Sequence, residues 1–127
     1  GAAPPPHLRV TQVRVRAGDL IDLLEFAMAD GSVVNGGYSA TGGRAQPPFD
    51  LEADEAIVRI EAGQGAALEG VRVRTSKGRE SPWYGKQFGA AVKAFAGDAD
   101  NPIVGFDRGM AGVCPAIIGV RLLDEAE

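Results

Sequence analysis

The feature that most constrains this chain is the alternation of apolar and polar residues in short runs separated by glycine-rich turns. In residues 8–17, Leu8, Val10, Val13 and Val15 are spaced by polar neighbours, a period of two with one slip. A period of two places successive side chains on opposite faces of a strand. Further runs of this kind cover 21–28, 56–62, 68–76, 101–106 and 116–123. We therefore expect an all-β domain of about ten or more short strands.

The chain length and the positions of its proline-rich and acidic segments define the expected domain organisation. A chain of 127 residues predicts one domain with a core of its own. The proline-rich residues 1–8 predict an extended or mobile leader, 9–123 the domain, and 124–127 an acidic tail. Only residues 89–97 follow a helical pattern, and that run is marginal in length.

Charge and cysteine content exclude several classes of partner. The net charge of −4 argues against nucleic acid and anionic membranes, which need basic surface. Cys114 is the only cysteine, so no intramolecular disulfide can form. We find neither a membrane-spanning apolar run nor a visible signal peptide. A secreted and a cytoplasmic location are both compatible with these observations.

Three segments of the chain line up as an internal repeat: 13–28, 58–75 and 104–123. Each contains a strand that ends near a glycine, a short bend, and a strand of aliphatic residues. One small sheet with a single apolar face is not stable alone in water, whereas three sheets around an axis bury three faces. The pattern favours a three-sided prism or a small propeller-like arrangement.

Several motifs carry a resemblance to a known family. They are GDLIDLLEF, the glycine pair at 42–43, FDLEADEAIVRIEAG, GVRVRTSKG, YGKQFG and IVGFDRGMAG. In their order and spacing, from about residue 9 to 123, they resemble the jacalin-related lectins of the mannose-binding type. The resemblance implies the β-prism I fold, with three four-stranded antiparallel sheets around a pseudo-threefold axis. It also implies binding of mannose, glucose or galactose through loops at one end, without metal, cofactor or catalysis.

In that family a sugar site joins a Gly-Gly loop to a GxxxD bend. The bend at 18–22 is intact, and we expect its partner loop, 42–43, in the second repeat. The implied carbohydrate-binding residues are Gly18, Asp19, Leu20, Ile21, Asp22, Gly42 and Gly43. Carboxylates would accept hydrogen bonds from sugar hydroxyls and main-chain N–H groups would donate to sugar oxygens. Glycine lets the main chain approach the ring closely.

The other two bends depart from the pattern. In the C-terminal bend, 112–116, Ala116 stands at the acid position and Pro115 removes a backbone donor. The N-terminal glycine loop expected beside this bend is replaced by AAPPPH, so we expect this site not to bind sugar. The middle bend carries the longer Glu69, and Trp83 and Tyr84 lie in the loop expected beside it. These three residues form a candidate secondary site, because an aromatic face can stack on a sugar.

Simpler interpretations stand beside these. Asp19 and Asp22 could cap a hairpin, and residues 97–102 favour an ordinary turn over a calcium loop. His7 and Cys114 have no sequence partner for catalysis. Two carboxylates on one bend do not form the opposed pair of a glycosidase.

The leading prediction is a non-enzymatic lectin domain that binds mannose- or glucose-type glycans or glycoproteins weakly, in a possible homo-oligomer. The alternative is a structural or protein-interaction β-prism domain that has lost sugar binding. An enzyme is the third and least favoured reading. The residues do not name the sugar.

Overall fold

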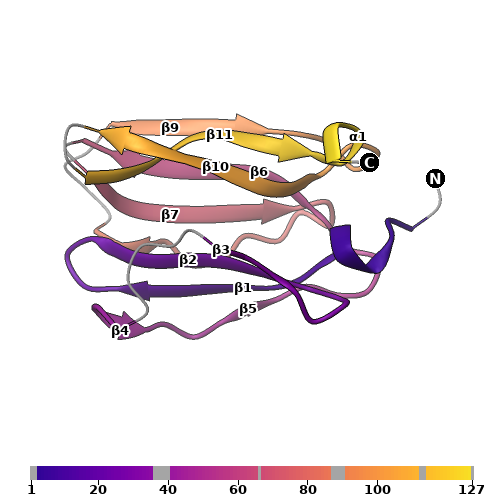
Figure 1. The fold of residues 1–127 in the computed structure, drawn as a ribbon, viewed down its shortest axis with the longest axis horizontal. Helices are drawn as coiled ribbons and strands as arrows, with labels where there is room; N and C mark the ends of the chain where they lie inside the picture. The colour runs from indigo at the N-terminus through magenta and orange to yellow at the C-terminus, as the bar shows by residue number, and fades with distance from the viewer. Residues whose placement is uncertain (1–2, 36–40, 66, 87–90, 112–113, 127) are drawn as a thin grey trace.

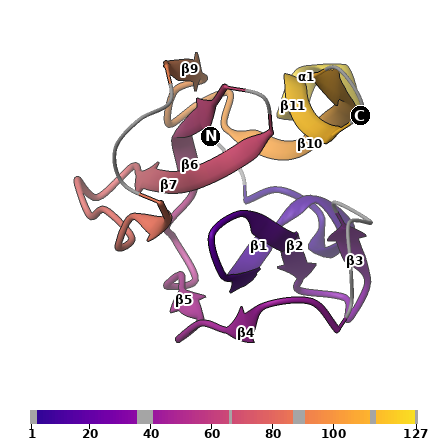
Figure 2. The same cartoon turned by 90° about the vertical axis from the view of Figure 1, so that its left-hand side faces the viewer.

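The computed structural model describes residues 3–35, 41–65, 67–86, 91–111 and 114–126, and it is built from antiparallel strands. Its long strands form three hairpins that run along the molecule (Figure 1). The hairpins are β1 (Val10–Ala17) with β2 (Ile21–Met28), β6 (Ile57–Gln64) with β7 (Leu68–Thr75), and β10 (Ile103–Ala111) with β11 (Cys114–Leu122). Figure 2 shows them arranged around a common centre. The all-β expectation is confirmed.

Short strands extend the first two hairpins. They are β3 (Val33–Asn35), β4 (Arg44–Ala45), β5 (Phe49–Asp50), β8 (Tyr84–Gly85) and β9 (Val92–Ala96). In the first sheet β3 pairs with β2, while β4 and β5 pair with β1; in the second, β8 pairs with β7 and β9 with β6. The third hairpin joins β6 through the single pair Ile103–Ile57. Hydrogen bonding among the described residues thus gives a five-stranded and a six-stranded sheet, where we expected three sheets of four.

The slip in the sequence pattern is a register shift, and it recurs. The pairing of β1 with β2 shifts between Val10 and Gln12, and that of β6 with β7 between Ile57 and Arg59. The pairing of β10 with β11 shifts at the same place in its hairpin, between residues 103 and 105. An extra residue in one strand lets the inward face resume one position later. Each first strand therefore buries its first and fourth residues.

The core lies where the three hairpins face one another. The largest fully buried side chains come from all of them and include Leu24, Phe26, Ile60, Ile103 and Ile117. Phe26 and Phe106 meet edge to face, with their ring centroids 5.1 Å apart. Because each such side chain contributes about 1.5–3 kcal/mol on burial, packing between hairpins dominates the stability.

Three local expectations need comment. The marginal helical candidate at 89–97 is wrong for its described part, because β9 pairs with β6 from Gly63–Val92 to Arg59–Ala96. Residues 89 and 90 lie outside the described residues. The leader contains one 3₁₀ turn, η1 (Pro6–Leu8), and the acidic tail a helical turn, α1 (Leu123–Ala126). Residues 97–102 form a turn in which the Asp98 carboxylate accepts N–H groups. No helix in the described residues is long and apolar enough to cross a membrane.

Candidate functional site

The bend between β1 and β2 is short and projects from the end of the first hairpin (Figure 1). Ala17 pairs with Ile21, and the N–H of Gly18 donates to the carbonyl of Leu20 at 3.0 Å. The N–H groups of Asp19 and Leu20 have no acceptor among the described residues, and Leu20 is 41% exposed. The side chain of Ile21, in contrast, is buried in the core. The bend therefore offers main-chain donors to solvent.

Gly43 lies directly against this bend. Its φ of +61° is in the left-handed region, and a Cβ there would collide with Oδ2 of Asp22 and lie 2.7 Å from the carbonyl carbon of Ala17. A Cβ on Gly18 would lie 3.9 Å from Cα of Gly43. Only glycine fits at position 43 without displacing Asp22. The structure thus brings together the intact bend and the glycine pair that the sequence singled out.

The two acids of the bend have no hydrogen-bond donor among the residues that the structure describes. Asp22 is partly buried and Asp19 is exposed, and neither carboxylate accepts a hydrogen bond from any described residue. A carboxylate offers two oxygens and several lone pairs to hydroxyl donors. Two free carboxylates, two free N–H groups and an uncovered main-chain segment form an arrangement suited to a ligand rich in hydroxyl groups.

Arg16 holds the glycine loop in place, a role that no motif in the sequence indicates. Its Nε donates to the carbonyl of Gly42 at 2.9 Å and its Nη2 to that of Gly43 at 3.1 Å. Arg16 stands at a polar position of the alternating pattern, and its partners are main-chain atoms, which every residue has. Gln46, three residues after Gly43, makes a second hydrogen bond to the first hairpin, since its side chain donates to the carbonyl of Ala17 at 3.3 Å.

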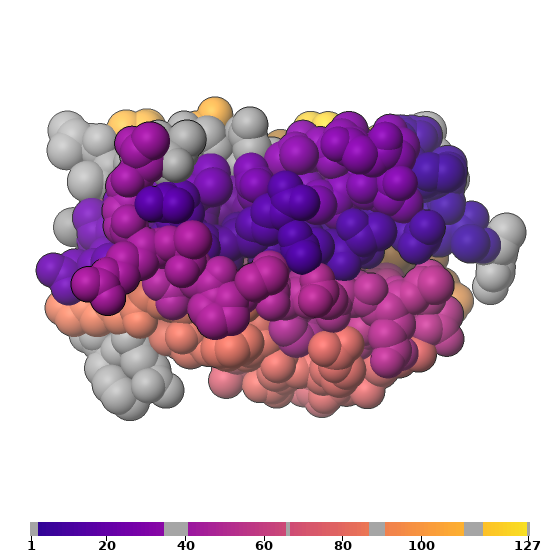
Figure 3. All heavy atoms as spheres, turned by 90° about the horizontal axis from the view of Figure 1, so that it is seen from below, coloured from indigo at the N-terminus to yellow at the C-terminus, as the bar shows by residue number. Residues whose placement is uncertain are grey.

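The loop also belongs to a different sheet from the one expected. β4 follows Gly43 and pairs with β1, with Arg16 opposite Ala45 and Ala17 opposite Arg44. The assignment of this loop to the second repeat is therefore wrong, because β4 pairs with β1, the first strand of the first hairpin. Figure 3 views the molecule from the side of this sheet, whose indigo-to-magenta segments cover much of that face.

The second bend, between β6 and β7, differs in character. Ala67 and Leu68 are buried, and Glu69 is partly exposed. Tyr84 is 3% exposed, its hydroxyl donates to the carbonyl of Pro47 at 3.0 Å, and burial raises its pKa. It cannot present a face to a glycan, so its place in the candidate secondary site is not supported.

Trp83 covers glycines of the second hairpin. Its Nε1 donates to the carbonyl of Lys86 at 2.9 Å. A Cβ on Gly63 would lie 3.2 Å from Cζ2 of Trp83, and a Cβ on Gly70 would lie 2.7 Å from Cε2. The ring therefore packs on the strands, with the guanidinium of Arg72 5.8 Å from its centroid. This is a packing role with one ring face toward a cation.

The third bend is only partly described. Gly112 and Val113 lie outside the described residues, and Ala116, at the acid position of the motif, is 4% exposed within β11. His7 is exposed in η1. Within the described ranges no three His, Cys, Asp or Glu side chains lie together as a metal site would require.

Comparison with known sequences gives one informative relative. No family model matches the chain. A curated Schizosaccharomyces pombe protein, provisionally named as a zinc metalloproteinase, is 29% identical over 103 residues, which cover 80% of this chain and 16% of that protein. The chain thus spans about a sixth of this relative.

Comparison with solved structures is more extensive. A mannose-binding jacalin-related lectin from Ananas comosus is 20% identical with a TM-score of 0.67, covering 97% of this chain and 85% of that one. Artocarpin in complex with mannotriose is 16% identical with a TM-score of 0.71, covering 95% and 85%. The mannose-binding lectin from champedak is 20% identical with a TM-score of 0.66, covering 90% and 81%. The chain therefore has the fold of the jacalin-related lectins.

Proposed function

We propose that this chain is a carbohydrate-binding lectin domain whose site is formed by the bend Gly18–Asp22 and the loop Gly42–Gly43. One observation carries the proposal: the partly buried carboxylate of Asp22 lies against Gly43, without a hydrogen-bond partner among the described residues. Leaving a polar group of this kind unsatisfied is costly unless water or a ligand completes it.

The chemistry of the site supports a glycan. Adjacent hydroxyls of a pyranose can donate to the two oxygens of one carboxylate, and such charge-assisted bonds are the stronger kind. The free N–H groups of Asp19 and Leu20 complement the ring and hydroxyl oxygens. We favour mannose- or glucose-type sugars, since several proteins with the same fold are named as mannose-binding or are complexed with mannose derivatives.

The expected affinity for a single sugar is weak. A few hydrogen bonds exchanged with water give little net free energy, which corresponds to a dissociation constant on the order of millimolar. Glycan binding of useful strength would then come from several sites acting together, in an oligomer or in a longer protein.

A second candidate is a structural or protein-interaction domain that has lost sugar binding. Ala116 favours it, because a buried methyl group occupies the acid position of the third bend. An enzymatic role receives no support from the described residues. The zinc metalloproteinase named among the relatives matches this chain over 16% of its length.

The test is Asp22→Ala, measured by glycan array and by calorimetric titration with methyl α-mannoside. We expect glycan binding to be lost while the free energy of unfolding changes by less than about 0.5 kcal/mol, since the carboxylate makes no bond in the described residues. Glu69→Gln is the matched control, as the equivalent position of the second hairpin, and it should bind normally.

Three results would contradict the proposal in different ways. A wild-type chain that binds no glycan supports the structural alternative. An Asp22→Ala chain that unfolds identifies the acid as a turn cap. Binding that survives Asp22→Ala but fails in Glu69→Gln moves the site to the second hairpin.

A further inference from the structure

A hollow lies on the outer face of the first sheet, beside the proposed glycan site. β4 pairs with Arg16 and Ala17 of β1, and β5 pairs with Gln12 and Val13, but the segment 46–48 between β4 and β5 forms no strand. Two residues of this segment are prolines, which have no N–H to donate to β1. The chain therefore departs from β1 there and leaves a hollow of about 380 Å³, within the range of small-molecule sites.

The walls of the hollow are side chains that share the outer face of the first hairpin. A strand places every second residue on one face, so Gln12, Arg14 and Arg16 lie together along β1. On β2, Glu25 lies opposite Arg14 and Leu23 lies opposite Arg16. At about 3.3 Å per residue, the lining extends for roughly 13 Å along β1. The remaining lining residues are Val15, Ala45, Gln46 and Pro48.

Arg16 joins the hollow to the proposed glycan site. Its Nε and Nη2 donate to the carbonyls of Gly42 and Gly43 at 2.9 and 3.1 Å, and its side chain also lines the hollow. Leu23, which lies opposite Arg16, directly follows Asp22 in the chain. The hollow therefore begins where the bend and the glycine loop end. A ligand that extends from Asp22 along the outer face of β1 enters it.

The polar groups of the hollow are partly bonded to one another. Arg14 donates through Nε to Gln12 at 2.6 Å and through Nη1 to Glu25 at 3.5 Å, and Gln46 donates its side-chain N–H groups to main-chain carbonyls. Two donors, Nη2 of Arg14 and Nη1 of Arg16, have no acceptor among the described residues. Two acceptors, Oε2 of Glu25 and Oε1 of Gln46, have no donor in the same part of the chain.

This mixture of groups selects a neutral ligand rich in hydroxyl groups. Each hydroxyl both donates and accepts, so neighbouring hydroxyls match both kinds of free group. A simple anion would meet the carboxylate of Glu25, and a simple cation would meet two guanidinium groups. Val15, Leu23 and Pro48 add apolar surface, which suits the C–H face of a pyranose ring.

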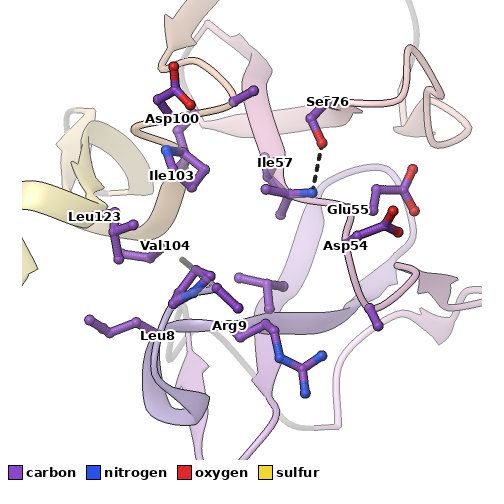
Figure 4. A pocket seen from close by; sticks show the side chains of 17 residues that line it. Leu8, Arg9, Asp54, Glu55, Ile57, Ser76, Asp100, Ile103, Val104 and Leu123 are labelled. Carbon is purple, nitrogen blue, oxygen red and sulfur yellow. Dashed lines mark hydrogen bonds between the residues drawn. The ribbon is translucent and has the colours of Figure 1, made fainter. Parts of the chain in front are cut away.

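A larger pocket, at the start of the three hairpins, has no such selectivity. Val10, Ile57 and Ile103, the first residues of β1, β6 and β10, line its volume of about 540 Å³. Figure 4 shows that the Arg9 guanidinium and the Asp100 carboxylate both extend away from its apolar space. No charged group there selects a ligand, and we assign none to it.

We propose that the hollow binds further sugar residues of a glycan whose first ring is held by Gly18–Asp22 and Gly42–Gly43. The inference rests on the proposed function and narrows it, because the ligand becomes an oligosaccharide chain. The first ring binds at the bend, and the next ring contacts Arg14, Glu25 and the apolar side chains of the hollow. Both sets of contacts then contribute to one affinity.

The experiment is a calorimetric titration of the full chain with methyl α-mannoside and with mannotriose. We expect mannotriose to bind at one site and about tenfold more tightly, which exceeds the roughly threefold gain that three equivalent rings give by statistics alone. Arg14→Ala should change the affinity for methyl α-mannoside less than twofold and lower that for mannotriose about fivefold, because it removes a donor from the hollow only. Arg74→Ala is the matched control, an exposed arginine of β7 in the second sheet, and it should bind both ligands normally.

A second variant fills the hollow. Ala45 is exposed in β4 and lies opposite Arg16, so the indole of Ala45→Trp should occupy the hollow and reduce the affinity for mannotriose to that for methyl α-mannoside. Ala94→Trp, at an exposed position of β9, is its control and should keep both affinities.

Two results would overturn the inference while methyl α-mannoside still binds. One is a mannotriose affinity within about threefold of that for methyl α-mannoside. The other is a wild-type ratio of the two affinities in folded Arg14→Ala and Ala45→Trp chains. A wild-type chain that binds neither ligand contradicts the proposed glycan site itself, and the inference fails with it.

Discussion

The tips of the first and second hairpins have equivalent strand register, but different groups cover their outer faces. Arg16 pairs with Leu23 in the first hairpin, and Gly63 pairs with Gly70 at the same place in the second. The first tip fills its face with its own side chains. The second has none there, and the ring of Trp83 covers both glycines instead.

This difference decides which tip can hold a glycine loop in place. Arg16 reaches the carbonyls of Gly42 and Gly43 and holds the loop against Asp22. Gly63, at the equivalent position, has no side chain to do this. An acid alone, such as Glu69, therefore does not make the second tip equivalent.

The largest effect is expected from adding a methyl group where Gly43 contacts Asp22. Gly43→Ala should abolish binding of methyl α-mannoside, because the added methyl group collides with the Asp22 carboxylate. It should also cost about 1–2 kcal/mol of unfolding free energy, since φ there is +61°. Calorimetric titration and thermal unfolding measure the two effects separately.

Gly78→Ala is the control for backbone strain. Gly78 has a φ of +77°, and nothing lies within 4 Å of a Cβ built on it. This variant should lose similar stability and bind the sugar normally. If Gly43→Ala also binds normally, the loop does not form part of the site and the contrast between the tips has no functional meaning.

A smaller effect is expected from weakening the hold on the Gly42–Gly43 loop while every proposed ligand-binding residue is kept. Arg16→Ala removes the bonds to the carbonyls of Thr41, Gly42 and Gly43, so the loop must be ordered on binding. We expect affinity to fall about tenfold, or roughly 1.4 kcal/mol. Arg16→Lys should recover part of the loss, because an ammonium can replace some of these bonds.

Arg14 offers a matched control for Arg16. It lies two residues earlier on the same strand and pairs with Glu25 at 3.5 Å on the exposed face, so it has no contact with the loop. Arg14→Ala should change sugar affinity by less than twofold. An equal loss in both arginine variants would show that the effect is general electrostatics, and raising the salt concentration would then reduce it.

The contrast between the tips also shows what the sequence could and could not reveal. Alternation predicted the long strands and even the slip at Thr11, because burial of one face imposes a period of two on the residues. The resemblance to the jacalin-related lectins singled out the bend and the glycine pair as the candidate site, and the structure brings Gly43 and Asp22 together. That these residues bind a sugar stays a prediction.

What the residues did not reveal depends on contacts between distant segments. The segment 89–97 has a helical composition, yet pairing along β6 makes its residues 92–96 a strand, so tertiary context overrides local propensity. The role of Arg16 depends on carbonyl groups, which every residue has. The pocket arises only where the three hairpin entrances converge, and no one segment contains it.

The smallest effect is expected at the second tip. Trp83 is the only tryptophan in the chain, so its emission reports on that tip without any substitution. Saturation with methyl α-mannoside should leave the emission unchanged if the sugar binds at the first tip. Trp83→Phe should bind the sugar normally and lose about 1 kcal/mol of stability, because it gives up the hydrogen bond to Lys86. A shift in emission on saturation, together with lost binding in a folded Trp83→Phe chain, would place the sugar on the ring of Trp83 and reverse the roles assigned to the two tips.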